Sequence, residues 1–345
     1  MTSHPVCGVV RSVLGQPWHW RGTAADGRDE GLAPDDLVMQ LLLARGVARD
    51  EVERHRAPTI RGFMPDPSIF RDMDRAAERL ADAVETGEAI TVFGDYDVDG
   101  ATSAALLIRL LRALGATLGY YIPDRLMEGY GPSGAALLGL GAAGTRLVVT
   151  VDCGAQAHEA LAQARDAGID VIVVDHHKCT AELPPALALV NPNRLDEAGD
   201  AAAHGHLAAV GVAFLLGAAL VRTLRQRGTF VERPEPRLVD LLDLVALGTV
   251  ADVASLRGLN RAFVAKGLIA MRRRDHVGHT ALMDVARLNG PPEAWHLGFM
   301  LGPRINAGGR IGRADLGVRL LLEGDVSEAA RIAQEAAQVG VALPA

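Results

Sequence analysis

Cysteine and lysine are scarce in this chain of 345 residues, and no apolar run is long enough to span a membrane. The three cysteines, Cys7, Cys153 and Cys179, form no C-x-x-C pair, which fits a reducing compartment. The first residues lack the apolar core of a signal peptide. The longest apolar run, Leu207–Val221, is too short for a bilayer and predicts a buried helix. We therefore expect a soluble, cytoplasmic protein without a membrane partner.

Arginine carries nearly all of the positive charge, since Lys178 and Lys266 are the only lysines. Arginine suits bidentate contacts to phosphate, although a biased genome composition would give the same count. The formal net charge of −7 argues against a non-specific polyanion binder. A cluster of metal-binding carboxylates, however, would add negative charge without describing the binding surface. The length and the 49% hydrophobic content allow two domains with a sizeable core.

Short all-apolar segments alternate with helical patterns from residue 90 onward. Strands are expected at Ile90–Phe93, Leu118–Ile122, Leu147–Val151 and Asp170–Val174, and helices at 71–86, Thr102–Leu114 and Ala155–Ala167. This alternation predicts an α/β fold with a doubly wound parallel sheet. In such a fold, ligands bind beyond the carboxyl ends of the strands.

Helical patterns flank this region on both sides. Before it, a loose arm over 1–32 is followed by helices that begin at Pro34 and Asp50. After it, we expect helices from Val210 and at Val239–Val250, and a mostly helical stretch over 260–345 that the glycine-rich GPRINAGGRIGRADLG interrupts. The expected domains are an N-terminal arm with helices at 1–75, a catalytic domain at 76–255 and a helical connector at 256–345.

An acidic motif follows the first expected strand, in the sequence TVFGDYDVDG. Asp95, Asp97 and Asp99 occupy alternate positions, and alternation on an extended segment points all three carboxylates the same way. Like charges that converge are costly unless a cation neutralises them. A calcium loop of the EF-hand type would need glutamate where Leu106 stands, and would follow a helix. The motif therefore predicts a site for a hard divalent metal.

Further candidate ligands follow the other strands. Asp152 and Asp175-His176-His177 each come directly after an expected strand, and Asp252 follows an expected helix. Alone, each has an ordinary interpretation, such as a helix cap or a loop pair. Together they provide ligands for more than one Mg²⁺ or Mn²⁺ ion. Two such ions about 3.5–4 Å apart can activate a water and stabilise an in-line attack on phosphorus.

The order of these motifs resembles a known superfamily. The segments GDYDVDGATSAALL, VVTVDCG, VVDHH, NPN and ALGTVADVASLRGLNR are similar to the DHH phosphoesterase superfamily. Within it, PDPSIFRDMDRAAERL, YIPDRLMEGYGPS and LGPRINAGGRIGRADLGVRLLL resemble the RecJ family of bacterial single-strand-specific 5′→3′ DNA exonucleases. The resemblance covers roughly residues 35–330.

The resemblance implies a role for each matched residue. It implies that two Mn²⁺ or Mg²⁺ ions are held by Asp95, Asp97, Asp99, Asp152, His176 and Asp252. Asp152 would bridge the ions, Asp175 would orient the histidines, and His177 would contact the scissile phosphate. The residues implied to bind DNA are Arg125, Gly129, Tyr130 and Gly131 near the 5′ end, beside Glu128, and Arg304, Asn306, Arg310 and Arg313 along the strand.

The implied function is hydrolysis of single-stranded DNA from its 5′ end to 5′-mononucleotides, in recombination and repair. The implied partners are single-stranded DNA, a RecQ-type helicase and a single-strand-binding protein. Members of the family continue into a DHH-associated domain and an oligonucleotide-binding barrel, whereas this sequence stops at Ala345. The resemblance implies that the associated domain forms the other wall of the DNA groove used in processive degradation. We therefore expect a truncated or frameshifted product, or a fragment, without that wall.

Two alternatives stay open. One is a DHH phosphodiesterase that acts on short oligoribonucleotides, cyclic dinucleotides or pyrophosphate. The arginine-glycine segment at 302–313 argues against it. The other is an inert DNA-binding remnant, and the complete set of carboxylates argues against that one.

Overall fold

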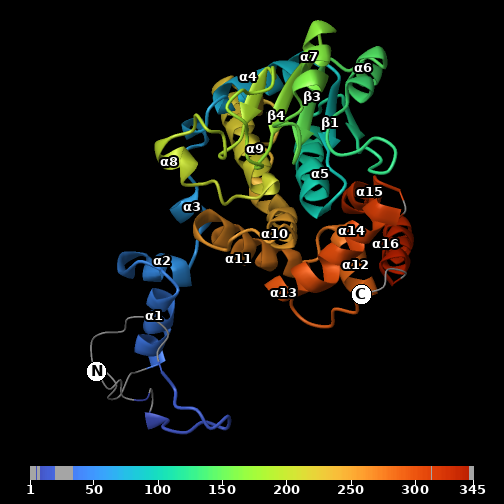
Figure 1. Ribbon diagram of the computed structural model, residues 1–345. Coiled ribbons are helices and arrows are strands. Elements are labelled where there is room, and N and C mark those ends of the chain that lie inside the picture. The colour runs from blue at the N-terminus through green and yellow to red at the C-terminus, as the bar shows by residue number, and fades with distance from the viewer. Residues whose placement is uncertain (1–4, 6–7, 20–33, 312, 342–345) are drawn as a thin grey trace. The chain divides into compact units, whose positions relative to one another are not determined.

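The computed structural model describes residues 5, 8–19, 34–311 and 313–341 (Figure 1). The chain divides into two compact units, residues 1–62 and 63–345. The first unit contains α1 (Pro34–Ala44), η2 (Arg49–Glu51) and α2 (Val52–Arg56), and α3 (Ile60–Phe63) ends at the boundary. The helices expected from Pro34 and Asp50 are confirmed. Most of the arm expected at 1–32 lies outside the described residues.

A parallel sheet of five strands forms the centre of the second unit. Its strands are β1 (Ile90–Gly94), β2 (Leu118–Tyr121), β3 (Leu147–Val151), β4 (Asp170–Val174) and β5 (Ala188–Val190), in the spatial order β2-β1-β3-β4-β5. The α/β prediction and its four strands are confirmed. Strand β5 was missed because it has three residues between prolines, too few for a period to be recognised.

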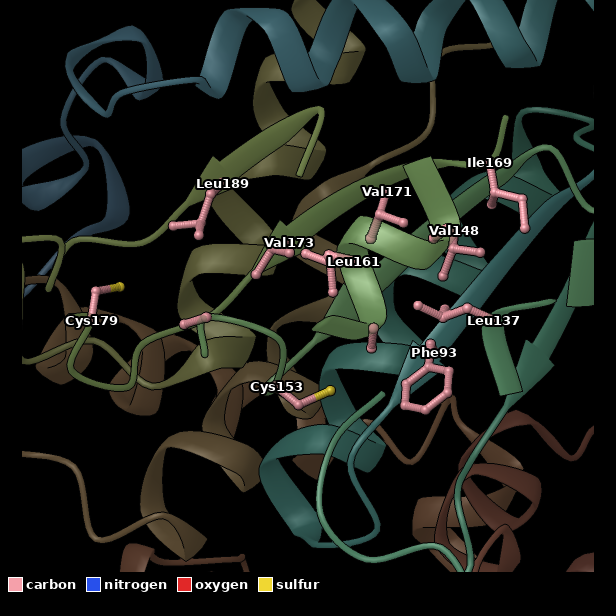
Figure 2. Packing of buried hydrophobic residues seen from close by; sticks show 13 residues of the cluster. Phe93, Leu137, Val148, Cys153, Leu161, Ile169, Val171, Val173, Cys179 and Leu189 are labelled. Atoms are coloured by element: carbon pink, nitrogen blue, oxygen red, sulfur yellow. The ribbon is translucent and has the colours of Figure 1, made fainter. Parts of the chain in front are cut away.

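Helices cover both faces of the sheet (Figure 1). On one face lie α6 (Gly134–Ala142) and α7 (His158–Asp166), and on the other α4 (Met73–Thr86), α5 (Val98–Ala113) and α9 (Ala209–Gln226). Figure 2 shows Phe93, Val148 and Val173 from three strands packed beneath Leu137 of α6 and Leu161 of α7. Alternate residues of each strand point to opposite faces of the sheet. The all-apolar strands can therefore pack against the helices on both faces.

Helix α9 contains most of the long apolar run of the sequence. Among the described residues, it is the one helix long and apolar enough to cross a bilayer. Most of it is buried, and it contacts α4, α5 and strands β3 and β4. The run is therefore a core helix of the unit, as the sequence predicted.

The rest of the unit is helical. It comprises η3 (Pro67–Ile69), α8 (Gly199–Ala202), η4 (Thr229–Val231), η5 (Leu238–Leu241), α10 (Leu242–Ala251), α11 (Gly258–Arg272), α12 (Val277–Val285), α13 (Ala294–His296), the π-helical turn η6 (Leu297–Leu301), α14 (Gly302–Ile311), α15 (Leu316–Leu322) and α16 (Val326–Val341). Helices α10 and α11 pack extensively on each other, one on each side of the expected domain boundary at 255. The expected boundaries at 75 and 255 stay predictions.

One expectation about this region is wrong. The glycine-rich segment was expected to interrupt the helices, yet its first ten residues form α14. Glycine in a helix costs about 1 kcal/mol relative to alanine, but tertiary packing overrides this preference. A Cβ at Gly308 would lie 2.6 Å from the Leu316 side chain, and one at Gly302 would lie 3.2 Å from Ala251 Cβ. The glycines thus allow neighbouring helices to approach closely.

Candidate metal centre

The acidic motifs meet at one edge of the sheet because three neighbouring strands end level with one another. Gly94 pairs with Val151, and Val151 pairs with Val174. The next residue along each chain is therefore an aspartate at the same edge: Asp95, Asp152 and Asp175. The amide of Asp95 donates to the carbonyl of Val151 over 3.3 Å, and that of Asp152 to Val174 over 3.0 Å. The backbone pairing of the strands thus places these three aspartates side by side.

The three aspartates of the first motif do not lie on one extended segment, and that expectation is wrong. Asp95 follows the strand, Asp97 caps α5 by accepting from the Gly100 amide over 3.0 Å, and Asp99 lies in the first helical turn. Helix α5 begins at Val98, four residues earlier than predicted, because Asp97 caps it. A Cβ at Gly100 would lie 2.5 Å from the Asp95 carbonyl oxygen, so the turn requires this glycine.

The fold nevertheless brings the predicted ligands together, in overlapping groups. In each group, one ligand atom per residue lies within 4.8 Å of the others, and the groups are Asp95, Asp97 and Asp152; Asp99, His176 and Asp252; and Asp152, His176 and His177. Asp152 Oδ1 lies 3.2 Å from His176 Nε2. Asp152 therefore stands between the first two groups, where a bridging ligand would lie.

Asp152 has an uncommon backbone conformation. Its φ is +61°, in the left-handed region that non-glycine residues seldom adopt. Such conformations cluster at functional sites, where the surrounding structure holds them in place. The Tyr130 hydroxyl donates to the Asp152 carbonyl over 3.0 Å and lies 3.3 Å from His177 Nδ1. This contact supports the backbone that carries the shared carboxylate.

The charges of the site fit a cation. Burial, followed by the charge of Asp97, raises the pKa of Asp95 to about 7. Burial and the charges of Asp99 and Asp97 raise the pKa of Asp152 well above its usual value. Asp95 Oδ1 and Asp152 Oδ1 are buried and have no hydrogen-bond partner. Buried, mutually repelling carboxylates with free oxygens form a site that a divalent ion would stabilise.

Asp99 has a second role that the sequence did not reveal. Its carboxylate accepts from the amide of Ala209 over 2.6 Å and from that of Val210 over 2.9 Å, at the start of α9. The residue at the cap position of α9 is Ala208, whose side chain cannot cap the helix. Asp99 supplies the missing acceptor from another helix. The sequence feature that could have revealed this role is the long apolar helix α9, because alanine stands at its cap position.

Asp175 binds the backbone and the side chain of the residues that follow it. Its Oδ1 accepts from the amides of His176 and His177 over 2.8 and 3.1 Å, and lies 2.7 Å from His177 Nδ1. Burial would raise the pKa of Asp175, but the hydrogen bond and charge of His177 lower it. The same hydrogen bond raises the pKa of His177. This geometry fixes the orientation of the His177 ring.

The implied DNA-entry residues lie beside this centre. The guanidinium of Arg125 lies 4.9 Å from the ring centre of Tyr96, which separates Asp95 from Asp97. Gly129 and Gly131 adopt positive φ on either side of the half-exposed Tyr130. Glu128 holds this loop, because it accepts from the Tyr121 hydroxyl over 2.7 Å.

The implied phosphate-binding residues of the 302–313 segment bind other parts of the chain. Arg304 donates to the Met300 carbonyl over 2.5 Å, and Arg313 forms an ion pair with Asp315 at 3.2 Å. Asn306 accepts from the Val98 amide over 3.1 Å, so it contacts the loop that carries Asp97 and Asp99. The side chain of Arg310 lies outside the described part of the structure.

The chain is similar to known proteins over most of its length. Residues 89–249 match the DHH family, N-terminal domain. The chain is 42% identical over 307 residues to the single-stranded-DNA-specific exonuclease RecJ of Salmonella typhimurium, covering 87% of this chain and 52% of that protein. The chain therefore spans about half the length of such relatives.

Two solved structures are similar to this fold. One is a crystal structure of exonuclease RecJ bound to manganese, with 36% identity and a TM-score of 0.69 over 79% of this chain and 66% of that one. The other is RecJ from Thermus thermophilus in complex with Mn²⁺, with 33% identity and a TM-score of 0.70 over 88% of this chain and 42% of that one. Motif order, sequence match and structural likeness agree that residues 89–249 form a DHH-family N-terminal domain, and RecJ exonucleases are similar relatives.

Proposed function

We propose that this chain is the catalytic core of a metal-dependent 5′→3′ exonuclease that hydrolyses single-stranded DNA to 5′-mononucleotides, in recombination and repair. The observation that carries the proposal is the pair of ligand groups on either side of Asp152. The similar RecJ exonucleases, with Mn²⁺ in two related crystal structures, support both the substrate and the ion.

We propose that two Mn²⁺ or Mg²⁺ ions are held here. Asp95 and Asp97 would bind the first, Asp99, His176 and Asp252 the second, and Asp152 would bind both. When bound, the two ions supply the positive charge that offsets the charge developing on phosphorus, and they activate the attacking water. The carboxylates, already placed by strand ends and helix ends, need little reorganisation to receive them.

His177 is the side chain that would contact the substrate. Its side chain is 46% exposed, and its Nδ1 is committed to Asp175, so Nε2 is left for a phosphoryl oxygen. The raised pKa of His177 favours the protonated ring, which can donate to that oxygen. A cavity of about 230 Å³ beside it, lined by Tyr130, Gln156 and their neighbours, offers space for part of a nucleotide.

A second candidate function has one observation in its favour. Arg304 and Arg313 are engaged within the chain, which weakens the basis for contacts along a long strand. A phosphodiesterase of short oligoribonucleotides or cyclic dinucleotides would need only the metal centre and the cavity beside it.

The location and partners follow from the first proposal. Chromosomal DNA in a bacterium lies in the cytoplasm, so we place the protein there. A RecQ-type helicase and a single-strand-binding protein are the proposed partners, because each would deliver single strands to the site.

A substrate panel separates the two candidates. The full chain is incubated with Mn²⁺ and, in separate reactions, a 5′-phosphorylated single strand, the same strand with a blocked 5′ end, and a diribonucleotide. Mononucleotide release that requires a free 5′ end supports the exonuclease. Cleavage of the diribonucleotide alone would reject it in favour of the short-substrate phosphodiesterase. Asp97→Ala is the control, and it should abolish either activity.

A further inference from the structure

The segment Asn191-Pro192-Asn193 has no role in the function described so far. It follows β5, and Val190 of β5 pairs with Val174 of β4. The residues after β5 therefore lie beside Asp175, His176 and His177, which follow β4. Asn191 is fully buried, although a buried amide side chain must find hydrogen-bond partners.

Each asparagine binds the backbone carbonyl of one histidine. Asn193 Nδ2 donates to the His176 carbonyl over 2.5 Å, and Asn191 Nδ2 donates to the His177 carbonyl over 2.8 Å. The main-chain amide of Asn193 donates to Asn191 Oδ1 over 2.8 Å, which joins the Asn191 side chain to the backbone of Asn193. The pair of asparagines therefore fixes the peptide that carries both rings.

Asn193 also reaches a second part of the site. Its Nδ2 donates to the Gly205 carbonyl over 3.0 Å. Gly205 lies in the loop that leads into α9, where the amides of Ala209 and Val210 hold the Asp99 carboxylate. One amide group thus joins the backbone of His176 to the loop that holds Asp99.

We propose that Asn193 is a positioning residue that sets the spacing between His176 and Asp99, and so forms the second ion's site. The inference rests on the proposed metal centre. His176 Nε2 lies 3.9 Å from Asp99 Oδ2, and His176 Nδ1 lies 3.8 Å from Asp252 Oδ2. Ligand spacing of this kind tolerates little movement, and groups that orient metal ligands change affinity about 10- to 100-fold when removed.

Gly205 provides an independent way to disturb the same contact. A Cβ at this position would lie 2.5 Å from Asn193 Oδ1. Gly205→Ala would therefore displace the Asn193 side chain without altering any donor. If Asn193 acts as proposed, Gly205→Ala and Asn193→Leu should have the same effect on metal binding.

The test is a titration of the full chain with Mn²⁺, in which binding is monitored by electron paramagnetic resonance. Two ions about 3.5–4 Å apart are magnetically coupled, whereas a single ion is not. The wild type should bind two ions with a coupled signal. Asn193→Leu and Gly205→Ala should keep the first ion, bind the second about 10- to 100-fold more weakly, and show the uncoupled signal at low Mn²⁺.

Arg79→Met is the matched control. Arg79 donates to Asp170 over 2.8 Å and to Glu88 over 2.7 Å, so its loss also removes two hydrogen bonds, at the amino end of β4. Arg79→Met should lower the melting temperature and leave the coupled signal unchanged.

Two results would overturn the inference. In one, both test variants bind the second ion as the wild type does. In the other, Arg79→Met loses the second ion as readily as they do, which would mean that general destabilisation is the cause. A wild-type chain that binds no pair of ions instead rejects the proposed metal centre, and this inference with it.

Discussion

The hydroxyl of Tyr130 donates a hydrogen bond to the main-chain carbonyl oxygen of Asp152 over 3.0 Å. The bond joins the loop after β2 to the residue that directly follows β3. It acts on a backbone with φ of +61°, and the carboxylate it supports is shared by two groups of ligands. Tyr130 therefore supports the proposed metal centre and also belongs to the implied DNA entry.

Removal of this hydroxyl should weaken the centre without unfolding the chain. Tyr130→Phe keeps the ring beside His177 but loses the hydrogen bond to Asp152, which contributes about 1 kcal/mol, and the 3.3 Å contact with His177 Nδ1. We expect roughly a tenfold fall in kcat and a higher Mn²⁺ requirement, with KM for the strand little changed. Steady-state hydrolysis at several Mn²⁺ concentrations measures both effects. A variant whose KM rises while kcat stays constant would show that Tyr130 serves DNA binding alone.

The metal-free chain should lose stability as pH rises. The pKa of Asp95 is raised from 3.8 to about 7, so the folded chain keeps a proton that the unfolded chain releases. Below about pH 4 both states are protonated, and the penalty is absent. Between about pH 4 and 7 the free energy of unfolding should fall, by an amount on the order of 4 kcal/mol for this shift.

Urea unfolding in the presence of a chelator measures this dependence. The same series with saturating Mn²⁺ should show a much smaller loss, because a bound ion favours the ionised carboxylates. Asp95→Asn removes the titrating group and should flatten the metal-free curve. A wild-type curve that rises between pH 4 and 7 without metal would contradict the assignment.

A buried carboxylate outside the proposed metal centre, that of Asp243, should contribute to stability alone. Asp243, at the start of α10, forms ion pairs with His276 and, at 2.7 Å, with His279. Burial opposes its charge, but the two histidines together lower the pKa of Asp243 below its usual value. Asp243→Ala should destabilise the chain by about 3 kcal/mol, because it removes one partner of a buried network.

The pH dependence of that loss follows from the direction of the shift. A lowered pKa contributes stability that is fully present above the unfolded value of about 3.9 and is lost as pH falls through the folded value. The difference in stability between wild type and Asp243→Ala should therefore shrink as pH falls below about 4. Unfolding curves from pH 3 to 7 test this, and a difference that grows towards acid would contradict it.

The location of the site could be predicted from sequence because it depends on local patterns. Short apolar strands that end in aspartate are visible along the chain, and parallel strands bring their carboxyl ends to one edge. Asp95, Asp152 and Asp175 were located in this way. The sequence did not predict the directions of the three carboxylates in the first motif correctly, because the chain leaves the strand after Gly94 and enters a helix at Val98.

The missed features depend on contacts between distant parts of the chain. Asp99 caps a helix 110 residues away, and Asn306 accepts from an amide 208 residues away. Strand β5 is too short to show a period, so the asparagines that follow it had no assigned place. Helix α14 forms because its glycines fit against neighbouring helices, which no local propensity reveals.

In the proposed function, Asp152 binds both of the metal ions at which a phosphodiester bond is hydrolysed. The most direct test compares Mn²⁺-dependent release of mononucleotides from a 5′-phosphorylated single strand by wild type and Asp152→Asn. Asparagine tolerates the left-handed backbone, so the substitution removes mainly the charge. We predict release by the wild type, a loss of at least about 100-fold in the variant, and unchanged or higher metal-free stability. Wild-type rates in Asp152→Asn would contradict the account.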